Sequence, residues 1–228
     1  MHIRQFSRGI AALSLSALTL TNCKSLQSNK ERGVLIGAAA GAAAGGAIGR
    51  ANGSTAKGAI LGAVVGGTIG GVIGHQMDQQ AKELEQNIPG AIVERVGEGI
   101  QVTFESGLLF DFNSDRVKPD AATNLKNLAA SLDKYPNSSL LIVGHTDAVG
   151  SDDFNQGLSD RRARSTALYL ASQGVGAGRL QTAGRGEIEP VAPNDTEAGM
   201  QKNRRVEVAI YASDAYRNQL RSQYKSGL

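Results

Sequence analysis

The sequence predicts an α/β (α+β) two-layer sandwich, in which one sheet carries helices on one face, preceded by a glycine-rich helical hairpin. Two observations support this prediction. From about residue 91 onward, apolar stretches of strand length alternate with amphipathic stretches of helix length. Through residues 33–74, glycine recurs at nearly every fourth position. Alternating strand and helix patterns are typical of a sheet covered by helices, and 228 residues suffice for one such domain with extra segments.

Within the predicted domain, the elements follow the order β-β-α-β-α-β-β. Residues 91–104 are typical of two short strands around the turn Gly97-Glu98-Gly99. A helix is predicted over residues 119–136, because apolar residues recur there at helical spacing between two prolines. The remaining predicted elements are strand 138–144, helix 152–174, strand 179–184, a short helical piece 196–203 and strand 204–211.

The two glycine runs, residues 33–49 and 58–74, contain no charged residue. Four-residue spacing places the glycines in one stripe along a helix, which lets another helix approach closely. Asn52-Gly53 is a turn signal between the runs, so we predict a helical hairpin over residues 33–74. The segment resembles glycine-zipper domains of envelope lipoproteins and predicts insertion in, or association with, a membrane and a possible homo-oligomer. The alternative is flexible Ala/Gly low-complexity sequence.

The N-terminus is typical of a secretory signal peptide, residues 1–22. Arg4 and Arg8 precede an apolar stretch that is too short for a spanning helix. Cys23 is the only cysteine, so it has no partner for an internal disulfide. The residues LTNC resemble the lipobox of bacterial lipoproteins, which implies lipidation of Cys23, a tether over residues 23–32 and an outer-membrane location. The alternative is a soluble exported protein with a free thiol.

Composition argues against several functions. Removal of Arg4 and Arg8 leaves 22 of the 24 basic residues against 21 acidic ones, so no basic excess favours nucleic acid. The three histidines are scattered and show no metal-ligand spacing, and no nucleophile elbow is present. The sequence therefore predicts no enzyme, no cofactor and no metal. A glycosidase-like pair of Asp147 with Asp152 or Asp153 is the weak alternative.

A candidate binding site begins at Asp147, which follows the buried strand 138–144. Ligands of α/β sheets tend to bind at such strand ends. On the next helix, Asn155, Leu158, Ser159 and Arg162 share one face by their spacing. Asp147 and Arg162 can then face each other across a cleft, either as a structural ion pair or as two groups that divide a zwitterionic ligand. His145 is expected to cap or pack locally, after a turn allowed by Gly144.

Four motifs decide between a structural ion pair and a ligand-binding site. They are FDFNSD (110–115), VGHTDAVGSDDFNQGLSDRRARS (143–165), GVGAGRLQTAGRGEIEP (174–190) and NRRVEV (203–208). Together they resemble the OmpA C-terminal family over about residues 100–211. The flanking segments are then a linker helix and first strand, 75–99, and a polar C-terminal tail, 212–228. Members of the family bind the diaminopimelate residue of the peptidoglycan stem peptide without cleaving it.

The resemblance implies a set of peptidoglycan-binding residues in this chain. Met200 departs from the basic residue of many relatives, and Asn203 and Arg205 belong to the same motif as Arg204. The implied function is non-covalent tethering of the outer membrane to the cell wall by a lipid-anchored protein. The alternatives are a membrane-assembly element acting through the glycine zipper, and a wall hydrolase. The implied binding residues are Asp111, Thr146, Asp147, Asn155, Leu158, Arg162 and Arg204.

Overall fold

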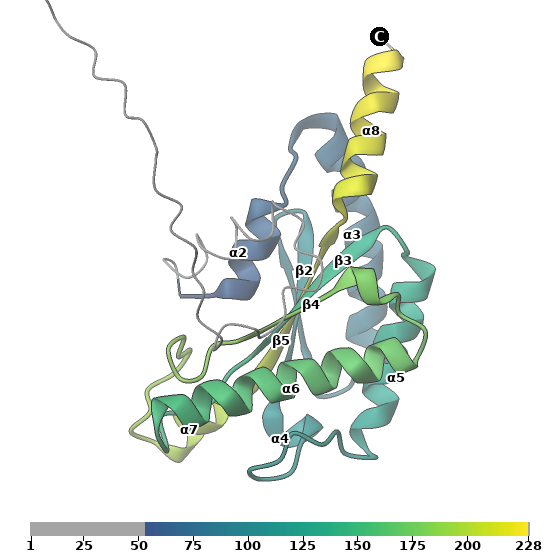
Figure 1. The fold of residues 1–228 in the computed structure, drawn as a ribbon. Helices are drawn as coiled ribbons and strands as arrows, with labels where there is room; N and C mark the ends of the chain where they lie inside the picture. Colours follow the sequence, from purple (N-terminus) through teal and green to yellow (C-terminus); the bar gives the residue numbers. More distant parts are fainter. Residues whose placement is uncertain (1–52, 228) are drawn as a thin grey trace, which may run out of the picture. The chain divides into compact units, whose positions relative to one another are not determined.

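The structure is a computed structural model that describes residues 53–227. The predicted signal peptide, Cys23, the tether and the first glycine run lie outside the described residues. The described chain forms a five-stranded sheet in the order β1-β2-β5-β3-β4 (Figure 1). The strands are β1 (Ile92–Val96), β2 (Gly99–Glu105), β3 (Ser138–Gly144), β4 (Leu180–Gly184) and β5 (Arg205–Ala212).

The pairing of the strands follows from the connections between them. β1 and β2 form an antiparallel hairpin whose turn contains Gly97 at a positive φ of 52°. β5 lies between β2 and β3 and is antiparallel to both. β3 and β4 are parallel, because the helix α6 (Asp152–Ser172) crosses over between them. The predicted α/β class and the order of its strands are confirmed.

One face of the sheet carries the larger apolar core. Alternate residues of the strands, such as Leu140 and Ile142 in β3, point into it because side chains alternate across a strand. The helices α3 (Gly67–Asn87), α5 (Ala121–Lys134) and α6 cover this face. In α5, the apolar stripe that the sequence predicts is buried through Leu125, Leu128 and Leu132.

The opposite face is also covered, which differs from the predicted two layers with helices on one face only. The helix α2 (Thr55–Gly62) packs Ala56, Ala59 and Ile60 against it. Their partners include Val143 of β3 and Tyr211 of β5. In Figure 1, α2 lies to one side of the strands, and α3 and α5 lie to the other. Sequence reasoning did not place this helix, because its residues show little amphipathic signal that would identify a partner surface.

The second glycine run is not one continuous helix. α2 ends at Gly62 and α3 begins at Gly67, and the connection is held by Glu98, whose carboxylate accepts the backbone N–H groups of Val65 and Gly66 at 2.8 and 2.7 Å. A Cβ at Gly70 would overlap this carboxylate. At Gly70, therefore, the missing side chain serves packing against the β1–β2 turn, whereas a Cβ at Gly66 or Gly74 would meet nothing within 4 Å. No helix among residues 53–227 is long and apolar enough to cross a membrane.

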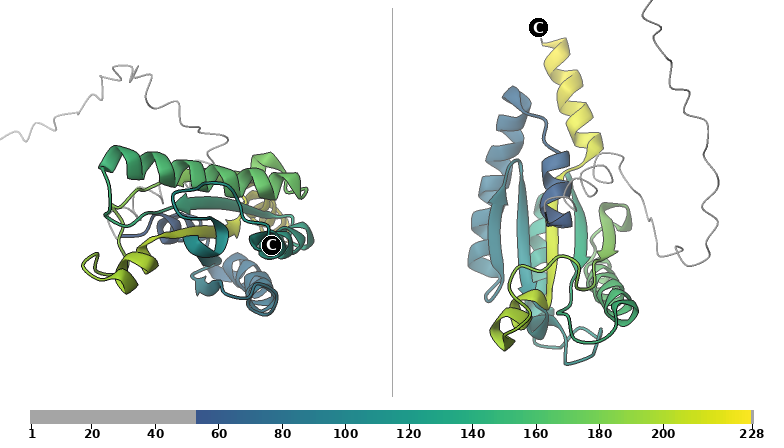
Figure 2. Two further views of the ribbon diagram at one scale, coloured as in Figure 1. Left: turned by 90° about the horizontal axis from the view of Figure 1, so that it is seen from below. Right: turned by 90° about the vertical axis from the view of Figure 1, so that its left-hand side faces the viewer.

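Both flanking segments contain a helix that contacts the rest of the fold. The helix expected in the 75–99 linker is the second part of α3, whose residues Met77, Ala81 and Leu84 belong to the main core. The polar tail contains the helix α8 (Asp214–Ser226), which extends beyond the end of β5 (Figure 2). Its buried Arg217 donates through Nη1 to the carbonyl of Ala63 at 2.6 Å. The tail is therefore tied to the α2–α3 connection.

Two strand-end glycines let α6 approach the sheet closely. A Cβ at Gly144 would overlap the carbonyl oxygen of Ser159, and one at Gly184 would lie 2.5 Å from the Ser159 hydroxyl. Close approach, rather than the turn predicted from sequence, is thus the reason for Gly144. The contact brings the first half of α6 against the carboxyl ends of β3 and β4. The short elements α4 (Ser106–Leu109), η1 (Ala177–Arg179) and α7 (Glu197–Asn203) complete the fold.

Candidate ligand-binding site

A pocket of about 560 Å³ opens where α4, α7 and the first half of α6 meet. α4 and α7 lie at the end of the sheet away from α8 (Figure 1). The pocket is lined by Ser106, Gly107, Phe110, Asp111, Phe112, Asn113, Thr146, Asp147, Val149, Gly150, Phe154, Asn155, Leu158, Arg162, Glu197, Met200 and Arg204.

All seven residues that the resemblance implies for binding line this one pocket. They come from four separate segments: the loop after α4, the end of β3, α6 and the junction of α7 with β5. The fold therefore brings the predicted residues together, while their role in binding stays a prediction.

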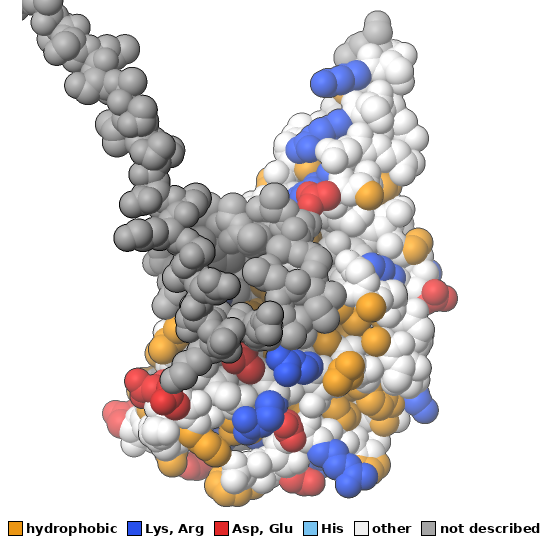
Figure 3. Space-filling model, viewed as in Figure 1, with side chains coloured by type: hydrophobic (Ala, Val, Ile, Leu, Met, Phe, Trp, Pro, Cys, Tyr) orange, Lys and Arg blue, Asp and Glu red, His pale blue; other side chains and the backbone are white. Residues whose placement is uncertain are grey.

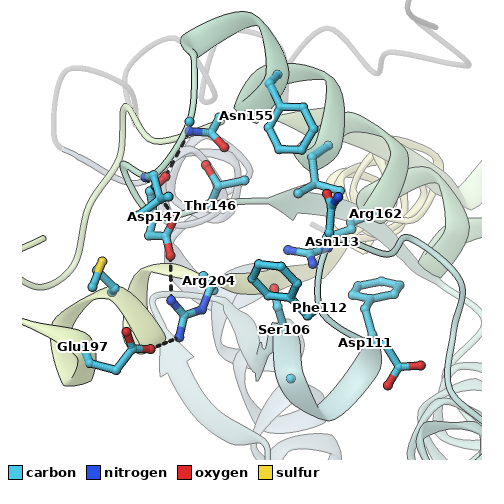
Figure 4. Close-up of a pocket in the computed structure, with 17 residues that line it drawn as sticks. Ser106, Asp111, Phe112, Asn113, Thr146, Asp147, Asn155, Arg162, Glu197 and Arg204 are labelled. Carbon is cyan, nitrogen blue, oxygen red and sulfur yellow. Dashed lines mark hydrogen bonds and ion pairs between the residues drawn. The ribbon is translucent and has the colours of Figure 1, made fainter.

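Asp147 is mostly buried, and its two oxygens have different partners. Oδ1 accepts the backbone N–H of Val149 at 3.1 Å, and Oδ2 pairs with Nη1 of Arg204 at 2.6 Å (Figure 4). Nη2 of Arg204 pairs in turn with Glu197 at 2.6 Å. Burial opposes the charge of Arg204, but the two carboxylates outweigh it and raise the pKa of its guanidinium. Because a carboxylate oxygen has two lone pairs, each oxygen of Asp147 can still accept another donor.

Arg162 is only 5% exposed and does not pair with Asp147, so the structural ion pair considered from sequence is not formed. Its Nε donates to the carbonyl of Ser114 at 2.9 Å, and its guanidinium lies 5.3 Å from the centre of the Phe110 ring. Burial lowers the pKa of this guanidinium. Within residues 53–227, no carboxylate forms an ion pair with Arg162. The side chain is therefore a buried cation that a ligand anion can reach.

Two hydroxyl groups of the pocket are buried without a partner in the described chain, Oγ1 of Thr146 and Oγ of Ser106. Buried polar groups are normally hydrogen-bonded, so these two hydroxyls have hydrogen-bonding capacity that a ligand in the pocket can use. The family resemblance included Thr146, but sequence reasoning missed Ser106. It also missed Glu197, although Glu197 lies seven residues, or two helical turns, before Arg204.

Asn155 and Asp111 line the pocket, but their side-chain polar groups bond to or point towards other parts of the protein. Nδ2 of Asn155 donates to the backbone carbonyl of Asp147 at 3.3 Å and to Glu187 at 2.6 Å, so this side chain holds the loop that carries Asp147. The side chain of Asp111 is 78% exposed and lies 3.9 Å from Lys118. Figure 4 shows its carboxylate directed away from Arg162 and Asp147.

Apolar side chains form the mouth of the pocket. Phe112 is 98% exposed, and Val149 and Phe154 are also exposed. The adjacent Asn113 has a positive φ of 54°, which re-aims the chain directly after Phe112. Exposed large apolar residues beside polar groups are typical of a binding surface. Sequence reasoning missed this rim, because a Phe in a motif shows no sign of whether it is buried.

Met200 lines the pocket, whereas Asn203, Arg205 and His145 lie outside it. Asn203 is fully buried and binds the backbone of Val191 and Ala192. Arg205 pairs with Glu207 at 2.8 Å beside His145, on the face of the sheet that α2 covers. The expectation that His145 is structural agrees with this position, and burial lowers its pKa.

Charge on the visible surface is mixed. On the face seen in Figure 3, basic and acidic side chains are interspersed and form no continuous basic area within the described residues. In the same part of the chain, no group of three or more His, Cys, Asp or Glu residues could hold a metal ion.

Fold and site together define a class: an α/β ligand-binding domain whose pocket offers a carboxylate and a separate, unpaired guanidinium. Two family models match the chain, the OmpA family over residues 109–204 and the YMGG-like Gly-zipper over residues 1–78. The chain is 37% identical over 138 residues to the probable lipoprotein YiaD of Escherichia coli, covering 60% of this chain and 63% of YiaD. The matched segment thus spans less than two thirds of that relative.

Two further comparisons cover more of the matched protein. The outer-membrane lipoprotein YfiB of Pseudomonas aeruginosa is 37% identical over 50% of this chain and 68% of YfiB. The structure of the cell wall anchor of the T6SS from Pseudomonas aeruginosa superposes with a TM-score of 0.54, at 31% identity, over 59% of this chain and 97% of that one. The chain belongs to the OmpA family.

Proposed function

We propose that this protein binds peptidoglycan non-covalently through the diaminopimelate of the stem peptide and tethers the outer membrane to the cell wall. The observation that supports this most is the separation of charges in the pocket. Asp147 and Arg162 line one cavity without pairing with each other. A ligand that carries an ammonium and a carboxylate on one carbon can contact both.

In this proposal, the ligand ammonium binds Asp147, whose oxygens retain free lone pairs beside Arg204. The ligand carboxylate binds the terminal nitrogens of Arg162, whose planar guanidinium suits a two-pronged contact. The unpaired hydroxyls of Thr146 and Ser106 supply further hydrogen bonds. Diaminopimelate of the stem peptide has both charged groups on one carbon, and the OmpA family membership supports this choice over other zwitterions.

The anchoring part of the proposal concerns residues outside the described structure. We infer that Cys23 is lipidated in the outer membrane and that residues 100–211 lie in the periplasm. The relatives YiaD and YfiB support this location, because one is described as a probable lipoprotein and the other as an outer-membrane lipoprotein. The YMGG-like Gly-zipper match supports an additional assembly role, which we assign to the first glycine run, residues 33–49.

The experiment is co-sedimentation of the full-length protein, in detergent, with purified sacculi. Asp147→Ala should lose binding by about 10- to 150-fold, because a charge-assisted hydrogen bond contributes about 1.5–3 kcal/mol. Asp153→Ala is the matched control, since Asp153 is an exposed carboxylate in the first turn of α6 and does not line the pocket. Unchanged binding by the Asp147 variant would refute the proposal. Release of soluble wall fragments by the parent protein would favour the hydrolase alternative.

A further inference from the structure

The first turn of α2 is bonded to a loop that also reaches the pocket. Thr55 is buried; its backbone N–H and its hydroxyl both donate to the carboxylate of Glu189, at 3.0 and 2.5 Å. Nε of Arg185 donates to the same hydroxyl at 2.7 Å. Arg185 and Glu189 are the ends of residues 185–189, which we call the bracing loop. Three hydrogen bonds therefore join α2 to this loop in a buried setting.

The middle of the bracing loop contacts the pocket residues. The carbonyl of Gly186 accepts the backbone N–H of Thr146 at 2.8 Å, and Glu187 accepts the side chain of Asn155 at 2.6 Å. Asn155 also donates to the carbonyl of Asp147. The backbone on either side of Asp147 is thus held by the bracing loop or by a residue bonded to it.

The course of the bracing loop is closely determined. Gly186 has a positive φ of 49°, and a Cβ there would lie 3.2 Å from the backbone nitrogen of Gln156. The side of the loop next to the sheet is bound by Arg205, which donates to the carbonyl of Glu189 at 3.1 Å. The backbone N–H groups of Arg185 and Gly186 donate to the carbonyl of Gly144 and the hydroxyl of Ser159, both at 2.9 Å. Within residues 53–227, α2 adds the contacts of Thr55 with the side chains of Arg185 and Glu189. A change at Thr55 can therefore be transmitted to the loop, and from it to Thr146 and Asn155.

α2 also packs closely against the sheet. A Cβ at Gly99 would lie 2.5 Å from Cγ2 of Ile60 and 2.6 Å from the carbonyl of Ile210. The glycine at the start of β2 is therefore what admits the Ile60 side chain. Together with the contacts of Ala56 and Ala59, this gives α2 one position on the second face.

We propose that α2 is a positioning element of the binding pocket: its docking on the second face orders the bracing loop, which holds Thr146 and Asp147 in the binding geometry. The inference rests on the proposed function of that pocket. A site that is ordered before the ligand arrives loses less conformational entropy on binding. Part of the glycine-zipper match thus serves the wall-binding domain, on the sheet face opposite its main core.

The test measures affinity of the full-length protein, in detergent, for a soluble muropeptide that contains diaminopimelate. Thr55→Val keeps the shape of the side chain and removes the hydroxyl, and should weaken binding by about five- to tenfold. Thr55→Ser restores the hydroxyl and should bind within about twofold of the parent. Lys57→Ala is the control on the same helix, because Lys57 forms an exposed pair with Glu94.

A double-mutant cycle separates positioning from general destabilisation. Glu189→Gln leaves one acceptor oxygen for the two donors of Thr55, so it weakens the same pairing from the loop side. Thr55→Val and Glu189→Gln together should therefore cost less affinity than the sum of the two single losses. The backbone amide of Thr146 should exchange its hydrogen faster in the Thr55→Val variant than in the parent. In the Lys57→Ala variant, its exchange rate should equal that of the parent. The inference would be overturned if the Thr55→Val variant bound the muropeptide as tightly as the parent, or if hydrogen exchange at Thr146 were unchanged in it. Failure of the parent to bind muropeptide would instead refute the proposed function, and the exchange measurement would still decide whether α2 controls the loop.

Discussion

Two consecutive arginines take part in two different carboxylate clusters. We call the pocket cluster of Arg204, Asp147, Glu197 and the nearby Arg162 the open cluster, and the buried cluster of Arg205, Glu207 and His145 the closed cluster. Arg204 caps the end of α7; its side chain is 30% exposed and pairs with Asp147 and Glu197 in the pocket. Arg205 begins β5, is 2% exposed and pairs with Glu207 on the opposite face of the sheet. The two side chains diverge at the junction of α7 with β5, where Arg204 caps the helix and Arg205 is the first residue of the strand.

The clusters differ in how the hydrogen-bond donors of their arginines are used. In the closed cluster, Arg205 also donates to the carbonyls of Glu189 and Asn203, so its donors are directed at acceptors of the protein itself. In the open cluster, Arg162 and two buried hydroxyls have capacity left for a ligand. The same side-chain chemistry therefore stabilises the fold in one place and is available for binding in the other.

The largest effect is expected when the closed cluster is broken. Glu207→Gln leaves Arg205 buried without its carboxylate, and should lower the free energy of unfolding by about 3–5 kcal/mol. Chemical denaturation measures this change. Glu94→Gln is the control, because the pair of Glu94 with Lys57 is exposed and should contribute less than about 1 kcal/mol. A loss of similar size in both variants would show that the closed cluster is not a stabilising one.

The second effect concerns the unpaired guanidinium of the open cluster. Arg162→Lys should weaken muropeptide binding by about 10- to 100-fold, because a point charge lacks the planar fork that suits a carboxylate. Isothermal titration with a soluble muropeptide measures it. Arg161→Lys is the adjacent control, since Arg161 is half-exposed and pairs with Asp115 at 3.1 Å outside the pocket. Equal losses in the two variants would contradict a specific role for Arg162.

The third prediction is the pH dependence of the closed cluster. Burial raises the pKa of Glu207, but His145 and Arg205 outweigh burial and lower the pKa from 4.5 to about 2. Because the pKa is lowered in the folded state, the stabilisation is fully present above pH 4.5 and is lost as the pH falls towards 2. Denaturation of the parent should show this loss, and Glu207→Gln should flatten the curve in that window. A curve of the same slope in both proteins would argue against it.

The smallest effect is expected at the rim of the open cluster. Glu197→Gln removes one of the two carboxylates that bind Arg204, but its side chain is largely exposed and water can replace the contact. Muropeptide affinity should change by less than about threefold. A loss as large as that expected for Arg162→Lys would mean that Glu197 contacts the ligand.

Local patterns in the sequence determined the order of strands and helices in residues 91–211. Alternation along β5 and the apolar stripe of α5 identify these elements, because each pattern reflects which face is buried. Spacing on α6 likewise placed Asn155, Leu158 and Arg162 on one face, and position after a buried strand singled out Asp147. The family resemblance then added Asp111, Thr146 and Arg204 to the same pocket.

Only the tertiary structure decided which partners these groups have. Asp147 pairs with Arg204 rather than Arg162, because α7 places Arg204 beside the end of β3. α2 covers the second face, and Thr55 contacts a residue 134 positions away. Pairings at such separations depend on how several elements pack at once, so no local period encodes them. The sequence by itself determined the main elements of residues 91–211 and seven of the 17 residues that line the pocket. Packing decided which charged groups pair with each other and which remain available to a ligand.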